Sequence, residues 1–359
     1  PMRDASLAFF RELVDTPSVS GYEEGAADVF LDYLSFATTE KDLHGNAYAA
    51  LNPDAPFRIM LAGHIDEIGF VVHHVADDGF LYFKTVGGHD ATIVVGQRVW
   101  VHGPKGRVAG VIGRKAIHLL TEEERKKRPE IHDLWIDIGA TKKDEALEHV
   151  ELGDFVTYQW EYAELLNGRA TARGFDNKMG AFMVAEALRL LHEEGGLHPE
   201  VGVIAVGTVQ EEIGLRGART AAARLKPKVG IAVDVNHAMD IPGVSKTRYG
   251  VLDVGKGPSV VRGPNANPAL FRLIRQAGDE DKIPYQVDVE PSGTGTDGNA
   301  MQINPSEHGG MAVAILGGAL RYMHTPCEVL SLEDVENGAK LIAATIRRIG
   351  PETNFVPGR

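Results

Sequence analysis

The residues with the clearest chemical potential in this sequence are carboxylates and histidines, and Asp176 is central among them. Asp176 follows Gly174 and Phe175 and opens a helical pattern that runs to about residue 195. An aspartate in this place is a typical helix N-cap. Its two oxygens can also hold two divalent cations, which then sit roughly 3.5–4 Å apart, the spacing used in two-metal hydrolysis. Further candidate metal ligands elsewhere in the chain would favour the second interpretation over the first.

Six further candidates follow apolar runs that are typical of buried strands. The runs cover residues 57–62, 201–209, 229–233 and 311–316. In open α/β sheets, sites form beyond the carboxyl ends of the strands, where loops converge. Singly, each candidate could be a packed histidine, a solvated acid or a turn cap, but together with Asp176 they predict a dinuclear metal site. The candidates after these runs, the last one after a short loop, are His64, Asp66, Glu211, Glu212, Asp234 and His324.

The expected ligands are imidazole nitrogens and carboxylate oxygens, without thiolates. This set suits zinc or cobalt, with manganese as a third candidate, better than a structural cysteine site. Three protein ligands for each ion would leave a position open for water. We expect Glu211 to act as the general base toward that water, and Asp66 to hydrogen-bond to His64 and fix its tautomer.

The composition argues against several classes of protein. The formal net charge is −13 at pH 7 in 359 residues, so nucleic acid is not an expected partner, because its phosphates would be repelled. No apolar run approaches the roughly 20 residues that span a bilayer, and the N-terminal segment is amphipathic rather than a signal peptide. We therefore expect no membrane association. The single cysteine, Cys327, excludes an internal disulfide and suggests a reducing compartment, so we expect a cytoplasmic protein.

The elements that must position these residues form an α/β unit made from both ends of the chain. Residues 3–14 have helical periodicity, and Ser20–Glu23 is typical of a capping box that starts a second helix. After residue 163, helices alternate with continuous apolar strands, as in a sheet buried on both faces. A last amphipathic helix begins at Ser331 and stops near Gly350.

The middle of the chain has a different character. Between about residues 67 and 162 we find six short β-rich runs, separated by turn signals and not interrupted by any long helical pattern. The charged block at residues 122–128 in this part is most simply a solvated loop or a turn of helix. We therefore predict an α/β catalytic domain formed by residues 1–66 plus 163–359, with a small all-β domain inserted at residues 67–162.

Five short motifs contain most of the candidate residues and occur in a fixed order. They are Gly63–Gly69 (GHIDEIG), Asp176–Lys178 (DNK), Glu211–Gly214 (EEIG), Gly295–Ala300 (GTDGNA) and Arg321–Pro326 (RYMHTP). This ordered set resembles the TET-type dinuclear-metal aminopeptidases, a family that includes glutamyl, leucyl and lysyl aminopeptidases. The resemblance extends from about residue 17 to residue 327, which is essentially the whole chain.

The resemblance implies a fold, a ligand set and an assembly. It implies an α/β/α sandwich of the zinc aminopeptidase type with a PDZ-like dimerisation insert, and a hollow tetrahedral dodecamer. The segment from His118 onward would be a loop that reaches a neighbouring subunit's site. With Glu211 as the base, the resemblance assigns one metal ion to His64, Asp176 and Asp234 and the other to Asp176, Glu212 and His324.

Three positions depart from the residues that are commoner in the family. Gly63 and Gly298 stand where alanine is commoner, and Lys178 stands where arginine is commoner. None of these changes removes a ligand, so they concern the shape of the site and its specificity.

The expected activity is metal-dependent removal of N-terminal residues from short peptides. One alternative is an amidohydrolase or deacylase with the same metal core that acts on small acylated metabolites. Another is a glycoside hydrolase of the endoglucanase type, a label that some relatives carry, but such an enzyme needs two carboxyl groups and no histidines or metal. A non-enzymatic scaffold would have lost a ligand, and none is lost here. The sequence does not select among acidic, basic and aliphatic N-terminal residues.

Overall fold

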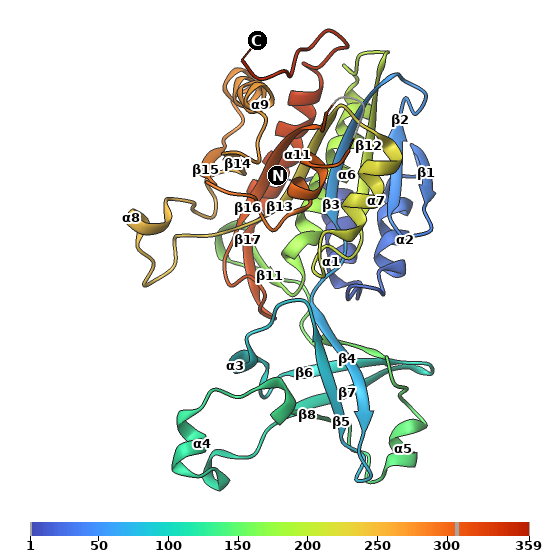
Figure 1. Ribbon diagram of the computed structural model, residues 1–359, viewed down its shortest axis with the longest axis vertical. Helices are drawn as coiled ribbons and strands as arrows, with labels where there is room; N and C mark the ends of the chain where they lie inside the picture. Colours follow the sequence, from blue (N-terminus) through green and yellow to red (C-terminus); the bar gives the residue numbers. More distant parts are fainter. Residues whose placement is uncertain (1, 306–308, 359) are drawn as a thin grey trace.

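An eight-stranded mixed sheet lies at the centre of the larger part of the molecule (Figure 1), in the order β1-β2-β12-β3-β13-β16-β14-β15. The computed structural model describes residues 2–305 and 309–358, so positions 1, 306–308 and 359 of the expected catalytic domain lie outside the described residues. The strands are β1 (Thr38–Lys41), β2 (Ala47–Leu51), β12 (Val201–Thr208), β3 (Phe57–His64), β13 (Val229–His237), β16 (Ala312–Leu320), β14 (Ser259–Arg262) and β15 (Gln286–Val289).

The four central strands of this sheet are parallel. β3 pairs with β12 and with β13, and β13 pairs with β16 along nine residue pairs. Parallel strands bring their carboxyl ends to the same edge of a sheet, where ligand sites form. The register places His64 opposite Thr208 at that edge, and Asp234 lies inside β13 because pairing with β16 continues beyond it.

Helices cover both faces of the sheet, as expected for an α/β/α sandwich. Hydrophobic residues of α7 and α10 pack on one face, and those of the other helices pack on the opposite face around α6. Helix α6 is buried over most of its length. The helices are α1 (Asp4–Asp15), α2 (Glu24–Tyr33), α6 (Phe175–Glu194), α7 (Arg216–Leu225), α9 (Pro268–Asp281), α10 (Asp297–Gln302) and α11 (Leu332–Ile346).

Glycines allow α6 to approach the sheet closely. A Cβ atom at Gly180 would lie 2.6 Å from the carbonyl oxygen of Val233, and one at Gly63 would lie 2.5 Å from the backbone of Ala181. Contacts this short force the backbone to shift. The glycine at position 63 thus suits this tight contact between β3 and α6.

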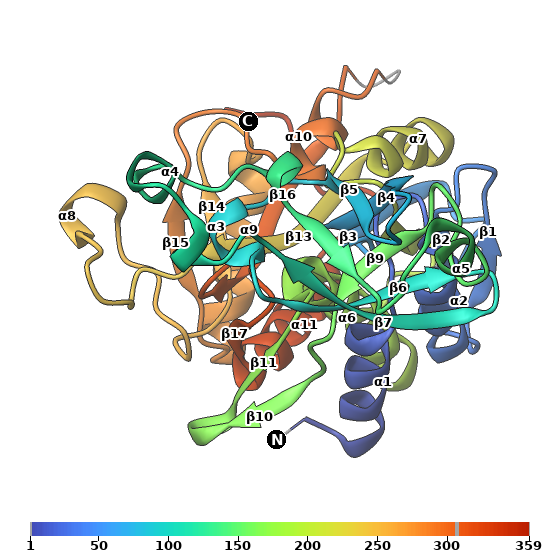
Figure 2. The ribbon, with the colours of Figure 1, turned by 90° about the horizontal axis from the view of Figure 1, so that it is seen from below.

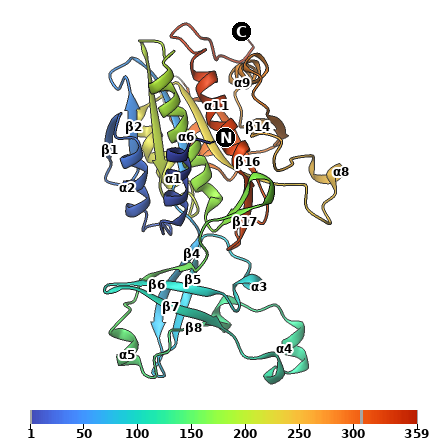
Figure 3. The same cartoon turned by 180° about the vertical axis from the view of Figure 1, so that it is seen from behind.

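A closed six-stranded barrel lies below the sheet (Figures 1 and 3), with its strands in the order β4-β5-β8-β7-β6-β9. It has a hydrophobic core of its own, and each of the six β-rich runs expected from the sequence contributes one strand. Short helices α3 (Ala91–Val94), α4 (Glu122–Lys126) and α5 (Lys143–Leu147) lie outside it. Its strands are β4 (Gly69–Val75), β5 (Leu81–Val86), β6 (Arg98–Gly103), β7 (Gly106–Gly113), β8 (Trp135–Asp137) and β9 (Phe155–Tyr158).

A small third sheet joins the barrel to the start of α6. It consists of β10 (Ala163–Leu165), β11 (Arg169–Ala172) and β17 (Glu328–Ser331), which are antiparallel. Seen from the barrel side, the β10–β11 hairpin projects at the lower left, on the other side of the N-terminus from α1 (Figure 2). Since β11 leads directly into the loop before α6 and β17 lies beside it, this sheet brings residue 328 next to Asp176.

Two expectations about local structure are wrong. Ser20 does not cap α2; its hydroxyl donates instead to Asp66 Oδ2 at 2.7 Å, because that buried carboxylate needs donors. Glu23 likewise accepts from the backbone N–H groups of Gly21 and Gln210. The last helix does begin after Ser331, which caps it, but ends at Ile346 rather than near Gly350.

Among the described residues, no helix combines the length and the apolar character needed to cross a membrane.

Candidate metal centre

Asp176 lies between two histidines that come from distant parts of the chain. One carboxylate oxygen, Oδ1, is 3.4 Å from His64 Nε2, and the other, Oδ2, is 3.2 Å from His324 Nε2. Asp176 is only 7% exposed, and its backbone departs from helical geometry although it lies in the first turn of α6. An ordinary N-cap side chain would accept a backbone N–H group of the helix, but here Asn177 Oδ1 does so, from Gly180 at 3.0 Å. A carboxylate that presents each oxygen to a different imidazole can hold two cations at once.

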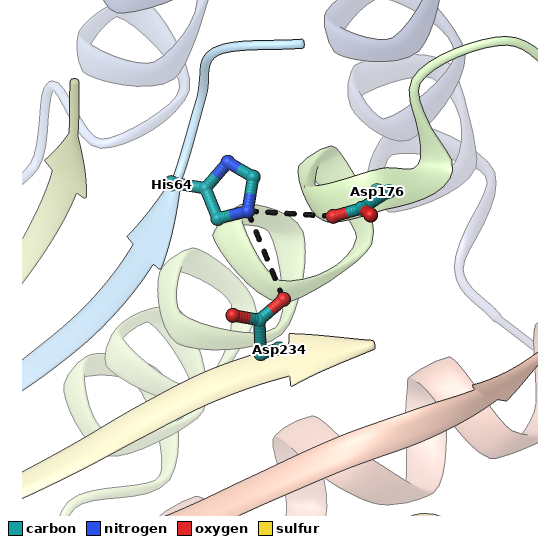
Figure 4. Close-up of side chains that lie close together, drawn as sticks. All are labelled: His64, Asp176 and Asp234. Atoms are coloured by element: carbon teal, nitrogen blue, oxygen red, sulfur yellow. Dashed lines mark ion pairs between the residues drawn. The ribbon is translucent and has the colours of Figure 1, made fainter. Parts of the chain in front are cut away.

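The first group of candidate ligands is completed by Asp234 on β13. His64 Nε2 lies 3.7 Å from Asp234 Oδ1, and both carboxylates point toward this ring nitrogen (Figure 4). One ligand atom from each of His64, Asp176 and Asp234 lies within 4.8 Å of the others, and all three side chains are buried.

The second group uses the other oxygen of Asp176. His324 Nε2 lies 3.6 Å from Glu212 Oε2, and ligand atoms of Asp176, Glu212 and His324 all lie within 4.8 Å of one another. The loop after β5 closes on this group, because a Cβ atom at Gly88 would lie 3.3 Å from His324 Nδ1. Two groups of three ligand atoms therefore share one aspartate.

Asp66 organises the residues around these groups from behind. Its Oδ1 accepts from the backbone N–H of Glu211 at 3.0 Å, and its Oδ2 accepts from that of Glu212 at 3.2 Å. His64 Nδ1 lies 3.1 Å from the carbonyl oxygen of Asp66 and 3.4 Å from its Oδ1. The hydrogen bond to His64 thus uses the backbone carbonyl of Asp66, with its carboxylate slightly farther away, and Asp66 also holds the backbone of Glu211 and Glu212, which the sequence did not indicate.

Glu211 is close to the first group without belonging to either set of three. Its Oε2 lies 3.8 Å from His64 Nε2, and its side chain is buried at the wall of a cavity. Burial raises the pKa of Glu211 to about 9, against the charge of His64 and with the help of nearby Asp234. An acid with this position could exchange a proton with a molecule bound in the cavity.

The electrostatics of the centre favour a bound cation. Burial, together with the charge of Asp176, raises the pKa of Glu212 well above its ordinary value, and burial also raises the pKa of Asp234. In addition, Glu212 Oε1 is buried and accepts no hydrogen bond from any residue that the structure describes. Positive charge at such a cluster offsets the desolvation penalty of the carboxylates, and the nitrogen and oxygen donors suit divalent transition metals.

Two buried cations hold the loop that carries Asp176. Arg173 donates to Glu67 Oε1 at 2.7 Å, and Lys178 donates to the same oxygen at 3.0 Å and to the carbonyl oxygen of Thr16. Although burial opposes it, the charges of Arg173 and Lys178 lower the pKa of Glu67 to about 2. Lys178 thus supplies a positive charge that compensates the charge of Glu67 beside the candidate metal ligands.

Glu328 is a buried residue of the centre that the sequence analysis missed. Its Oε2 accepts from the backbone N–H of Asp176 at 3.1 Å, and its Oε1 accepts from that of His324 at 2.9 Å. Burial and the charge of Asp176 raise the pKa of Glu328 well above its ordinary value. The only sequence signal was an acid that begins an apolar run typical of a strand, β17.

A cavity of about 410 Å³ opens beside both groups. Residues 293–296 line it, and Asp297 lies buried behind them with its carboxylate accepting from Thr208 Oγ1 at 2.5 Å. The cavity also reaches the ends of β13 and β15. It is large enough for the end of a small peptide.

A sheet that presents two carboxylate and histidine groups at one edge, beside a cavity, is an arrangement typical of metallohydrolases of the α/β class. Comparison with known proteins agrees with this class. The sequence pattern of the M42 glutamyl aminopeptidases matches residues 45–341. The chain is 34% identical to a lysyl aminopeptidase of Pyrococcus furiosus over 352 residues, covering 97% of this chain and 98% of that relative.

Solved structures give the same result. A TET aminopeptidase from the marine sediment archaeon Thaumarchaeota archaeon SCGC AB-539-E09 superposes with a TM-score of 0.91 at 33% identity, covering 97% of this chain and 98% of that one. The Pyrococcus horikoshii TET1 peptidase, described as assembling into a tetrahedron or a large octahedral shell, superposes with a TM-score of 0.84 at 31% identity, covering 96% and 100%. This chain belongs to the M42 glutamyl aminopeptidase family and is a metal-dependent peptide hydrolase. The resemblance inferred from the motifs is therefore confirmed.

Proposed function

We propose that this protein is a dinuclear metallo-aminopeptidase that removes N-terminal residues from short peptides. The observation that carries the proposal is the position of Asp176, whose two oxygens face His64 and His324 separately. Asp234 would complete one ion's ligands and Glu212 the other's. Zinc or cobalt, with manganese as a third candidate, matches these donors.

Bound cations at these two groups would polarise the scissile carbonyl and lower the pKa of the attacking water toward neutrality. Glu211 lies at the cavity wall near His64, so it is placed to take a proton from that water and return it to the leaving amine. Its raised pKa suits it to hold the proton between these two steps, and neighbouring positive charge would lower that pKa enough for it to act as a base. Asp66 would keep Glu211 and His64 in position.

The experiment that tests this function is the substitution Glu211→Gln. The neutral isostere keeps the shape of the side chain but cannot accept the proton, so hydrolysis of aminoacyl p-nitroanilides should fall by about 10²–10⁴-fold while two metal ions remain bound. Metal content would be measured by mass spectrometry. Near-normal turnover in a metal-loaded variant would contradict the role of Glu211.

Chelation separates this proposal from its alternatives. A metal-dependent aminopeptidase should lose activity with chelator and regain it with zinc or cobalt, whereas a glycoside hydrolase of the endoglucanase type should release sugar regardless. A deacylase with the same centre would instead cleave acylated metabolites and leave peptides with a free N-terminus intact.

The same relatives suggest an assembly. We propose that residues 67–162 form a PDZ-like dimerisation domain inserted into a catalytic domain of residues 1–66 and 163–359, and that dimers associate into a tetrahedral dodecamer. The barrel and its separate core support the division, and TET structures of the dodecamer and tetrahedron support the assembly. Light scattering, which gives the mass directly, would test it against the 38.8 kDa of one chain.

A further inference from the structure

One wall of the cavity beside the candidate metal ligands is acidic and contains none of those ligands. Asp288 on β15 and Glu290 just after it line the cavity, and β15 is the edge strand of the sheet. We propose that this wall binds the positively charged side chain of the substrate's first residue, so that the enzyme prefers N-terminal lysine and arginine. The inference rests on the proposed aminopeptidase function and specifies its substrate class.

A chain of contacts connects the metal group to the acidic wall. Asn236 lies two residues beyond Asp234 on β13 and so on the same face of the strand. Its Nδ2 donates to Asp288 Oδ2 at 2.9 Å, and its Oδ1 accepts from Ser259 Oγ at 2.9 Å. Ser259 lies opposite Gly317, which pairs with Asp234. The Asn236 side chain therefore reaches across the sheet and connects the strand of Asp234 to the Asp288 carboxylate. The four-carbon stem of a lysine would give the reach needed by a substrate whose scissile bond lies at the metals and whose charge lies at Asp288.

The acids of this wall have no positively charged partner of their own. Within the described part of the chain, neither Asp288 nor Glu290 forms an ion pair with lysine or arginine, and no lysine or arginine lines the cavity. Both side chains are only partly exposed. A cation that entered would gain two nearby negative charges, whereas the carboxylate of an N-terminal glutamate or aspartate would be repelled.

The rest of the cavity wall suits the aliphatic part of the same side chain. Val235, Val261, Ile315 and Met323 line it, and the first three are buried. Lysine and arginine bury their methylene stems along apolar surfaces and keep their charged ends at polar groups. An apolar wall alone would suit leucine equally well, so the two acids are what should separate basic from aliphatic residues.

The test compares substrates that differ only in charge. With the zinc- or cobalt-loaded protein, kcat/KM would be measured on lysyl, arginyl, norleucyl, leucyl and glutamyl p-nitroanilides. Norleucine keeps most of the length of lysine without its charge. We expect the lysyl and arginyl substrates to exceed the norleucyl substrate by about tenfold or more, a ratio within reach of one pocket, and the glutamyl substrate to be the poorest.

Matched variants locate the effect. Asp288→Asn and Glu290→Gln should each lower the ratio of lysyl to norleucyl kcat/KM by several-fold, because the lysyl value falls more than the norleucyl value. Glu200→Gln makes the same change of charge at an exposed side chain that lies outside the cavity and has no ion pair in the described residues, and should leave the ratio unchanged.

The outcomes are distinguishable. Three results would overturn the inference and leave the aminopeptidase function standing. They are equal kcat/KM values for the lysyl and norleucyl substrates, a preference for the glutamyl substrate, or an unchanged ratio of lysyl to norleucyl kcat/KM in a variant that combines Asp288→Asn with Glu290→Gln. If the metal-loaded protein hydrolysed none of the five amides, the proposed function would fail, and the inference with it.

Discussion

Glu328 accepts the backbone N–H of Asp176 at 3.1 Å, and with its other oxygen it accepts the N–H of His324. One side chain on β17 thus fixes the backbone of two residues that meet at the candidate metal centre from α6 and from the loop after β16. Mutation of a residue that orients metal ligands in this way typically lowers metal affinity by about 10–100-fold.

Glu328→Gln should therefore weaken metal binding more than it weakens the fold. A glutamine offers one acceptor oxygen, so one of the two N–H groups would face an amide NH₂ group. We expect metal affinity to fall by about 10–100-fold and activity to be restored by excess metal, while the melting temperature of the metal-free protein changes little. Titration with a competing chelator measures the affinity. Unchanged affinity, or inactivity at saturating metal, would show that Glu328 does not act through the ligands.

The shared aspartate leads to a prediction about stoichiometry. Asp176→Asn should weaken binding of both ions, because one group loses its Asp176 oxygen to an amide NH₂ and the other keeps only a neutral amide oxygen, whereas Asp234→Asn and His324→Ala should each weaken mainly one ion. Protein treated with chelator and reloaded would be analysed by native mass spectrometry. Two ions retained in Asp176→Asn would exclude the bridging role.

Stability should depend on pH in the absence of metal. Burial raises the pKa of Glu211 to about 9, so from the ordinary glutamate pKa of about 4.3 up to that value the folded chain keeps a proton that the unfolded chain releases. Stability therefore falls as pH rises. The raised pKa of His64 acts in the same direction, and burial lowers the pKa of Lys178 to about 8, which opposes the trend above that pH.

As the pH rises from about 6.5 to the pKa of Lys178, the melting temperature of metal-free protein should consequently decrease. Bound zinc should flatten this dependence, because positive charge lowers the carboxyl pKa values, and Glu211→Gln should remove part of it. Differential scanning calorimetry provides the measurement. Identical slopes with and without metal would contradict the explanation.

The close approach of α6 to the sheet can be tested at Gly180. Alanine there would place a Cβ atom 2.6 Å from the Val233 carbonyl oxygen and 2.4 Å from the Asn177 side chain. Overpacking of this kind destabilises by about 1–3 kcal/mol, measured by urea unfolding. Gly295→Ala is the control, since a Cβ atom at Gly295 would meet no heavy atom within 4 Å. Equal free energies of unfolding for the two variants would mean that α6 can shift away from the sheet at little energetic cost.

Much of the architecture could be predicted because it depends on local patterns. Alternating and continuous apolar runs indicated the six barrel strands and the four parallel strands, and the motif order indicated the family. The pattern failed where pairing overrides it: β13 continues through Asp234 to His237 because β16 pairs with it along that length. Ser20 was misread as a cap because nothing local shows that Asp66, far along the chain, recruits its hydroxyl.

The sequence alone determined which residue types stand at the ends of the buried strands, and so the chemistry available there. Only the tertiary structure decided that the two oxygens of Asp176 face different histidines, that Glu328 supports both sides of that arrangement, and that Asn236 ties Asp288 to the cavity. The reason is physical: strand periodicity is a property of neighbours in sequence, whereas these contacts join segments brought together only when the sheet pairs and α6 packs against it.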